Sequence, residues 1–146
     1  MKSIFNKTGS DEFIERINNL KADTKGKWGK MEVSQMLAHC AYAFEDNSPR
    51  PKVIARLLIR FFAKSTVVGK KPYKRNMKTS PAFIVKDKRD FETERTRLIK
   101  GIEKVQGLGE DYFNNRKHPV FGRMNSKEWN NFFSKHLDHH LKQFGV

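Results

Sequence analysis

The sequence has few of the residues that mark secreted or membrane-embedded proteins. Its only cysteine is Cys40, so no disulfide can form within the chain, and we expect a protein of a reducing compartment. No apolar run approaches the roughly 20 residues that cross a bilayer. The first residues, Met1 to Lys7, lack the apolar stretch of a signal peptide. We therefore expect a soluble cytoplasmic protein, and its 146 residues suit one domain, residues 1–146.

Acidic residues are nearly absent from the middle of the chain. From Arg50 to Arg89, thirteen residues are basic and only Asp87 is acidic, so this stretch carries +12 of the net charge of +14. The rest of the chain is nearly balanced. Positive charge is thus concentrated in a connecting segment, about residues 47–89, which either attracts an anionic partner or is simply solvated.

Alternating strand patterns are also missing, whereas helical periodicity is frequent. Apolar residues at three- and four-residue spacing predict four main helices, over about residues 10–21, 32–45, 90–107 and 125–144. The predicted fold is therefore all-α, a four-helix bundle with a long connection between its second and third helices.

Capping and helix-breaking residues suggest where these helices begin and end. The expected N-terminal caps are Ser10, Asp90 and Asn125. Gly107 and Gly109 are expected to end the third helix. We expect Thr66 to Val85 and Phe113 to Arg123 to be largely irregular surface connections.

The last helix has the strongest periodicity and contains two histidines on its apolar face. At about 100° per residue, His136 and His140 fall in the stripe that includes Trp129 and Phe133. Four residues apart, their rings can converge on one point, which is a spacing that chelates a metal. The alternative is two core histidines, each bonded to a carbonyl or a water. Spacing alone supports both interpretations equally.

The second helix offers a third imidazole. His39 lies beside the apolar stripe of that helix, where a side chain can reach sideways into a helical bundle, so it is the natural third ligand. Taken alone, it would more often be a surface or capping histidine. Cys40 faces the core in the same pattern, and we interpret it as a small hydrophobic residue.

An amphipathic basic helix is predicted within the connection, from about Val53 to Lys64. Its apolar residues oppose Arg56, Arg60 and Lys64. Such a helix either covers the bundle with its apolar side or binds a membrane surface or another anionic partner. We favour the covering helix, because an accessory helix on a bundle has the same pattern.

Two blocks of the sequence resemble the DinB-like superfamily, within a branch described as a domain of unknown function. The first block is Trp28-Gly29-Lys30-Met31 with Gln35-Met36-Leu37-Ala38-His39-Cys40. The second runs from Phe121-Gly122 through Trp129 to Lys135-His136-Leu137-Asp138-His139-His140-Leu141-Lys142-Gln143-Phe144-Gly145. The resemblance covers essentially the whole chain. It implies a four-helix bundle, often a homodimer, that binds a metal through His39, His136 and His140.

The resemblance implies a reaction type less clearly than it implies a metal. Its members include thiol-dependent S-transferases, an isomerase and a metal-dependent hydrolase. Three neutral imidazoles leave a divalent ion with an open position, as catalytic sites do, and zinc or nickel suits such ligands best. We expect a metal-dependent enzyme that transfers a low-molecular-weight thiol to an electrophile, with hydrolysis close behind. The substrate would be a small, anionic molecule attracted by the basic segment.

Several other polar residues are candidates for the surroundings of the site. They are Gln35, Glu94, His118, His139 and Gln143.

The competing hypothesis is a non-enzymatic binding module that uses residues 50–89 for an anionic partner. Nucleic acid is the obvious anion, but no recognition helix or RNA-binding motif is visible, and the aromatic residues lie on core stripes. The sequence argues against nucleic acid and against a membrane surface as partners.

Overall fold

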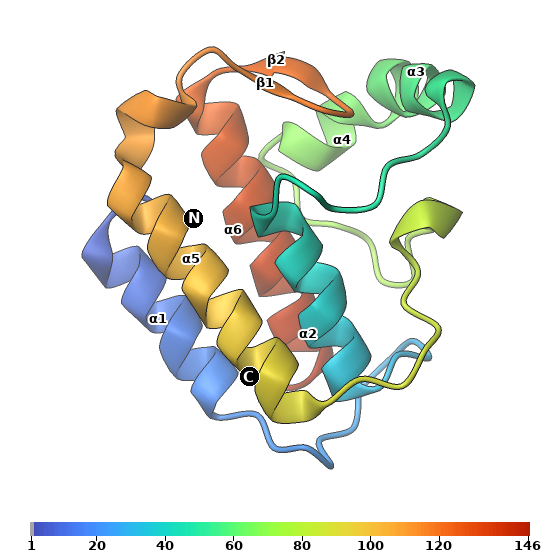
Figure 1. The fold of residues 1–146 in the computed structure, drawn as a ribbon, viewed down its shortest axis with the longest axis vertical. Coiled ribbons are helices and arrows are strands. Elements are labelled where there is room, and N and C mark those ends of the chain that lie inside the picture. The colour runs from blue at the N-terminus through green and yellow to red at the C-terminus, as the bar shows by residue number, and fades with distance from the viewer. Residues whose placement is uncertain (1) are drawn as a thin grey trace.

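The computed structural model describes residues 2–146, and it is mostly helical, as an all-α fold requires (Figure 1). The helices of this part are α1 (Lys7–Asn18), α2 (Val33–Ala41), α3 (Val53–Phe62), α4 (Lys64–Val68), α5 (Phe91–Phe113) and α6 (Ser126–Gln143). Two short 3-10 helices span Tyr42–Phe44 and Pro81–Phe83, and two strands, β1 (Arg116–His118) and β2 (Gly122–Met124), form a hairpin. No helix in this part of the chain is long and apolar enough to cross a membrane.

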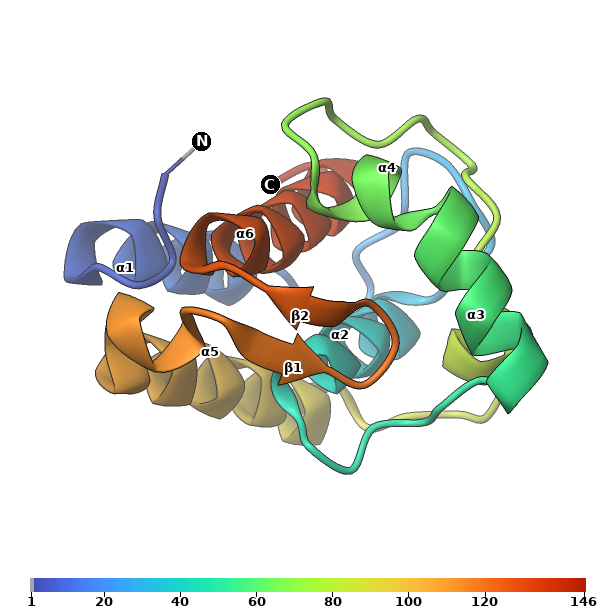
Figure 2. The same ribbon diagram turned by 90° about the horizontal axis from the view of Figure 1, so that it is seen from above.

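The core lies between α1, α2, α5 and α6, which run side by side (Figures 1 and 2). Helices α5 and α6 contact each other, and each also contacts α1 and α2. The largest side chains at the centre are fully buried, among them Ile17, Leu37, Leu98, Phe133 and Leu137. Cys40 is fully buried as predicted, and burial raises the pKa of its thiol, so it behaves as a small apolar residue.

Helix α1 begins earlier than the sequence indicated. Asn6 is the cap, and its side chain accepts a hydrogen bond from the backbone N–H of Gly9. The predicted cap, Ser10, instead lies inside the helix, where its hydroxyl donates to the carbonyl of Lys7 at 3.0 Å. Both residues are good caps by type, and the acids after Ser10 favoured the wrong one.

Helix α5 begins at its predicted cap but continues past its predicted end. The side chain of Asp90 accepts from the N–H of Thr93, whereas Gly109 has a φ of 75° and interrupts the helical geometry. One more turn follows, to Phe113. The glycine therefore bends the end of α5 and does not stop it.

The prediction of an irregular stretch from Phe113 to Arg123 is wrong, because β1 and β2 pair there in antiparallel register. Each strand has three residues, too few for alternation to be recognised in a sequence. The indole N–H of Trp129 donates to the carbonyl of Arg116, which fastens the hairpin to α6.

Helix α3 forms where it was predicted but does not cover the core. None of its residues is buried, and six of its apolar side chains are 48–79% exposed. Its place at the edge of the molecule is clear in both views (Figures 1 and 2). The prediction that its apolar side packs onto the other helices is therefore wrong.

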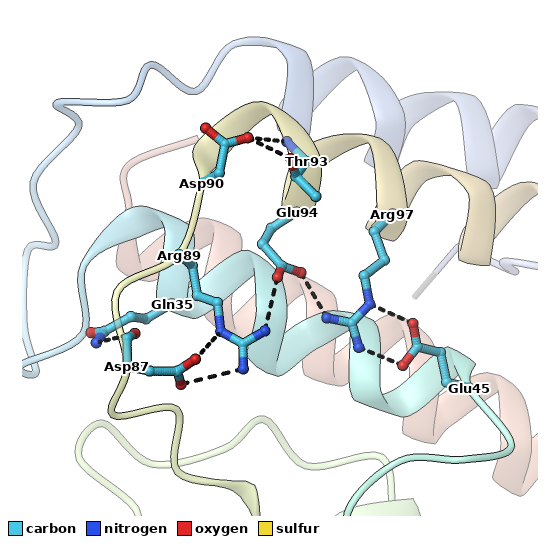
Figure 3. Close-up of polar contacts among 8 residues, drawn as sticks. All are labelled: Gln35, Glu45, Asp87, Arg89, Asp90, Thr93, Glu94 and Arg97. Carbon is cyan, nitrogen blue, oxygen red and sulfur yellow. Dashed lines mark hydrogen bonds and ion pairs between the residues drawn. The ribbon is translucent and has the colours of Figure 1, made fainter.

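The connection from α4 to α5 rejoins the helices through an ion-pair network (Figure 3). Glu94 is 4% exposed and receives Arg89 at 3.2 Å and Arg97 at 2.8 Å. Arg97 also binds Glu45 through two nitrogens, and this carboxylate raises the pKa of the guanidinium. The paired charges fasten the start of α5 to the segment that follows α2.

Candidate metal centre

Two helices with well-defined starts position the three histidines. Helix α6 begins with a reciprocal capping box between Asn125 and Glu128, which orients the stripe that carries His136 and His140. Helix α2 begins with a similar box at Glu32 and carries His39 in its last turn. Because α2 and α6 are in contact, the imidazoles face one another across the space between the helices.

The three imidazoles form one compact cluster. The Nε2 atoms of His39 and His136 are 2.9 Å apart, and the three ring centroids lie 4.8–4.9 Å from one another. One ligand nitrogen from each ring lies within 4.8 Å of the other two. His39 and His140 are each 8% exposed. Three imidazole nitrogens gathered in this way can hold a metal ion.

Hydrogen bonds on the far side of two rings assign their protons. Nδ1 of His39 lies 2.9 Å from the carbonyl oxygen of Phe83, which can only accept, so this nitrogen carries the hydrogen. Nδ1 of His140 lies 2.8 Å from Oε1 of Gln143, whose amide nitrogen donates to the carbonyl of Trp28. Both neutral rings therefore present a free Nε2 lone pair toward the cluster.

His136 is the ring that protein groups leave unsatisfied. Its Nδ1 is buried, and no hydrogen-bond partner for it exists among the described residues. Nδ1 is unpaired in both tautomers of His136. If Nε2 carries the proton, it donates to Nε2 of His39; if Nδ1 carries it, two Nε2 lone pairs meet at 2.9 Å. An unpaired buried polar atom costs about 1–3 kcal/mol. A cation at the cluster removes the repulsion in the second arrangement.

Burial keeps all three rings neutral. It lowers the pKa of His39, and it lowers the pKa of His140 to about 3. Burial also lowers the pKa of His136 well below its usual value, with a further contribution from the neighbouring histidines. Neutral imidazole is the form that binds a metal, so none of the three rings has to release a proton before a metal ion binds.

A cavity of about 860 Å³ opens beside the cluster and is mostly apolar. Its walls include the three clustered histidines, together with Phe62, Phe83, Phe121 and Phe132. This volume is in the range of pockets that take small organic molecules. A ligand in the cavity would therefore meet the imidazoles and the aromatic rings, with charged side chains elsewhere in the lining.

A known family matches almost the whole chain, including the three clustered histidines. The model of a family described as a protein of unknown function (DUF1569) matches residues 5–145. The chain belongs to this family. Comparison with curated proteins and with solved structures found no match.

Of the other residues proposed for the surroundings, Gln143 touches the cluster directly through His140. His139 is partly buried at the cavity wall, with its ring 5.1 Å from that of His140 and close to Trp28 and Tyr73. Burial lowers its pKa. Gln143 and His139 therefore both lie beside His140 of the cluster.

His118 reaches the cavity from the hairpin but not the cluster. Its ring packs against Phe121, Trp129 and Phe132, and its Nδ1 accepts from the N–H groups of Val120 and Phe121. Burial lowers its pKa to about 4. It is thus a neutral histidine that holds the hairpin turn.

Gln35 and Glu94 lie away from the cavity. Gln35 completes the capping box of α2 and donates to the carbonyl of Asp87 (Figure 3). Glu94 belongs to the ion-pair network with Arg89 and Arg97. Both residues stabilise helix starts, and neither lines the cavity.

Sequence reasoning missed one group that supports the cluster and one buried lysine that fastens α6 to the segment around α4. The carbonyl of Phe83 holds His39, and no pattern in the sequence signals a backbone oxygen from an irregular segment. Lys135 is 4% exposed and donates to the carbonyls of Thr66 and Gly69 at 2.6 Å each. Burial lowers its pKa to about 8. Neighbours on a helix point about 100° apart, so its place beside His136 along the chain was no sign of this burial.

Proposed function

We propose that His39, His136 and His140 hold a divalent metal ion and that the protein is a metal-dependent enzyme. The observation that carries this proposal is the convergence of three buried or half-buried neutral imidazoles, with the Nε2 atoms of His39 and His136 only 2.9 Å apart. The Nδ1 atoms of His39 and His140 are held by other groups, so the Nε2 lone pairs of these two rings point into the cluster. A cation gives the converging ring nitrogens a common partner.

The hydrogen-bond partners of the Nδ1 atoms of His39 and His140 also favour metal binding. Phe83 and Gln143 each accept the Nδ1–H of one histidine, which fixes the ring orientation and makes the opposite nitrogen a better donor. With only imidazole nitrogens as donors, zinc and nickel are the best-fitting ions. Among the described residues no carboxylate or thiolate completes the cluster, so a position is left for a ligand from the cavity.

When bound, such an ion supplies a Lewis acid that activates a nucleophile at neutral pH. The residues of the chain would do the rest. The aromatic walls exclude water, and cationic side chains in the cavity lining attract an anionic substrate; these are Lys30, Arg50, Lys78, Arg116 and Lys117. Glu45 and Asp46 also line it, but each is paired with a basic residue.

Transfer of a low-molecular-weight thiol to an electrophile is the leading reaction, and hydrolysis is the second. The resemblance to the DinB-like superfamily motivates this order, and the mostly helical fold and the histidine cluster are compatible with the resemblance. Membership of that superfamily, with its four-helix bundle, is part of the same proposal.

The proposal is tested by the metal content of the purified full chain. We expect about one ion per chain in the wild type, and a loss of roughly 10-fold or more in affinity for His136→Ala and for His140→Ala. His118→Gln is the matched control, because it removes a partly buried histidine from the same cavity wall but not from the cluster. Equal metal content in all four proteins would remove the site.

The two reactions differ in what they consume. Metal-loaded protein is incubated with a reactive aryl or alkyl halide, with and without a small thiol. Product that forms only with the thiol, and only in the wild type and His118→Gln, supports thiol transfer. Turnover of ester or amide substrates without a thiol supports hydrolysis.

A further inference from the structure

Helix α3 presents its apolar side to solvent. Its exposed apolar residues are Val53, Ile54, Leu57, Leu58, Phe61 and Phe62, which are 48–79% exposed. At about 100° per residue they cover about half of the helix circumference. A continuous exposed apolar surface of this kind usually marks a site where another molecule binds.

The opposite side of α3 is attached to the hairpin by polar groups. The guanidinium of Arg60 lies directly over Gly122, where an added Cβ would come within 1.7 Å of Nη2. In the helical segment that follows, Lys64 donates to the carbonyl of Arg123 at 2.8 Å and lies 3.7 Å from Glu128. The helix is therefore held with its charged edge inward and its apolar side outward.

The surroundings of α3 are strongly basic. Lys52, at its start, is exposed, and so are Arg116, Lys117 and Arg123 of the neighbouring hairpin. The segment that contains α3 has thirteen basic residues and one acid between Arg50 and Arg89. A second copy of the chain would bring two such segments together, and their repulsion would oppose the contact.

We propose that α3 docks on the surface of an anionic lipid bilayer. The helix lies in the plane of the interface, its apolar side enters the boundary between headgroups and acyl chains, and the basic residues around it face anionic headgroups. An apolar side flanked by fixed positive charge fits this partner, since neither a neutral bilayer nor a neutral protein groove would compensate the charge. Ile59 and Phe62 also line the cavity, so docking brings one cavity wall to the bilayer.

The first test is sedimentation of the full chain with vesicles of phosphatidylcholine alone or mixed with phosphatidylglycerol. We expect binding to the mixed vesicles that weakens with added salt. Ile54→Ser with Phe61→Ser removes two of the most exposed side chains, neither of which lines the cavity, and should weaken binding roughly 10-fold or more. Ile84→Ser is the matched control, an exposed apolar residue outside α3, and should bind as the wild type does.

A second pair of variants tests the charge without touching the apolar side. Lys52→Glu with Arg123→Glu reverses two of the exposed basic residues and should weaken binding to the mixed vesicles roughly 10-fold or more. Lys21→Glu with Lys25→Glu makes the same change in net charge in the exposed connection after α1 and should have a much smaller effect. Circular dichroism of each variant establishes that it is folded.

Three results would overturn the proposal. The first is no sedimentation with either vesicle. The second is equal loss of binding in the α3 variants and their controls. The third is a dimer in analytical ultracentrifugation that Ile54→Ser with Phe61→Ser converts to monomer while vesicles bind neither form, since a second copy would then cover α3.

Discussion

Helices α6 and α3 have the same kind of amphipathic pattern and opposite surroundings. The apolar stripe of α6 is buried, with Phe133 1% and Leu137 0% exposed, and two imidazoles lie within it. The apolar side of α3 is exposed, with Phe61 78% exposed, and its polar edge faces the hairpin. Periodicity therefore identifies which residues share a face but not what covers that face.

The two helices also differ in how they are fastened. Helix α6 starts with a capping box and packs against α1, α2 and α5. Helix α3 has no side-chain cap and is held through Arg60 and through Lys64 beyond its end. We expect α6 to unfold only with the whole molecule and α3 to open locally.

The largest expected difference comes from the same substitution made in both helices. Phe133→Ala should lower the free energy of unfolding by about 3–5 kcal/mol, because it leaves a cavity in a core ringed by Phe44, Phe113 and Trp129. Phe61→Ala should change it by no more than about 0.5 kcal/mol, since that ring is already in solvent. Urea unfolding of both variants measures the two effects. A large loss of stability for Phe61→Ala would mean that the apolar side of α3 is covered in solution. The contrast between a buried α6 and an exposed α3 would then be wrong.

Much of the helical pattern was predictable, because caps and periodicity act over a few residues. Asp90 and Asn125 cap their helices as predicted, and α3 lies within its predicted range. The start of α1 was not predictable, because Asn6 and Ser10 are both good caps and only the native contacts choose between them. The hairpin was missed because a three-residue strand has no periodicity.

The histidine cluster was predictable in its membership but not in its support. The four-residue spacing of His136 and His140 can be recognised in the sequence, and the structure brings His39 to them. Gln143 lies three residues after His140 on the same helix, so local spacing alone could have identified its contact. The carbonyl of Phe83 comes from a distant irregular segment, which no local rule reaches.

His118, which packs against Trp129 and Phe132 of α6, should make the free energy of unfolding sensitive to acid. The pKa of His118 is lowered to about 4 by burial, so between about pH 6.5 and 4 the unfolded chain binds a proton that the folded chain does not. Stability from this group is complete above pH 6.5 and falls as the pH falls, by up to about 3 kcal/mol at pH 4. Protonation of Nδ1 also ends the hydrogen bonds from Val120 and Phe121.

The measurement is urea unfolding of the wild type and His118→Gln at several pH values. The difference between the two free energies isolates His118, because the clustered histidines contribute to both proteins. The variant should lose stability less steeply over this range. Parallel curves would show that His118 titrates alike in the folded and unfolded chains.

The smallest expected effect compares the two helix starts. Asn125→Ala removes a cap whose side chain accepts from the N–H of Glu128, and it should cost about 1 kcal/mol of global stability. Lys52→Ser offers α3 a cap that it lacks, so it should slow amide exchange within α3 while the urea midpoint stays unchanged. Both results follow if α6 unfolds with the core and α3 does not. A gain in global stability for Lys52→Ser as large as the loss for Asn125→Ala would mean that α3 folds cooperatively with the core.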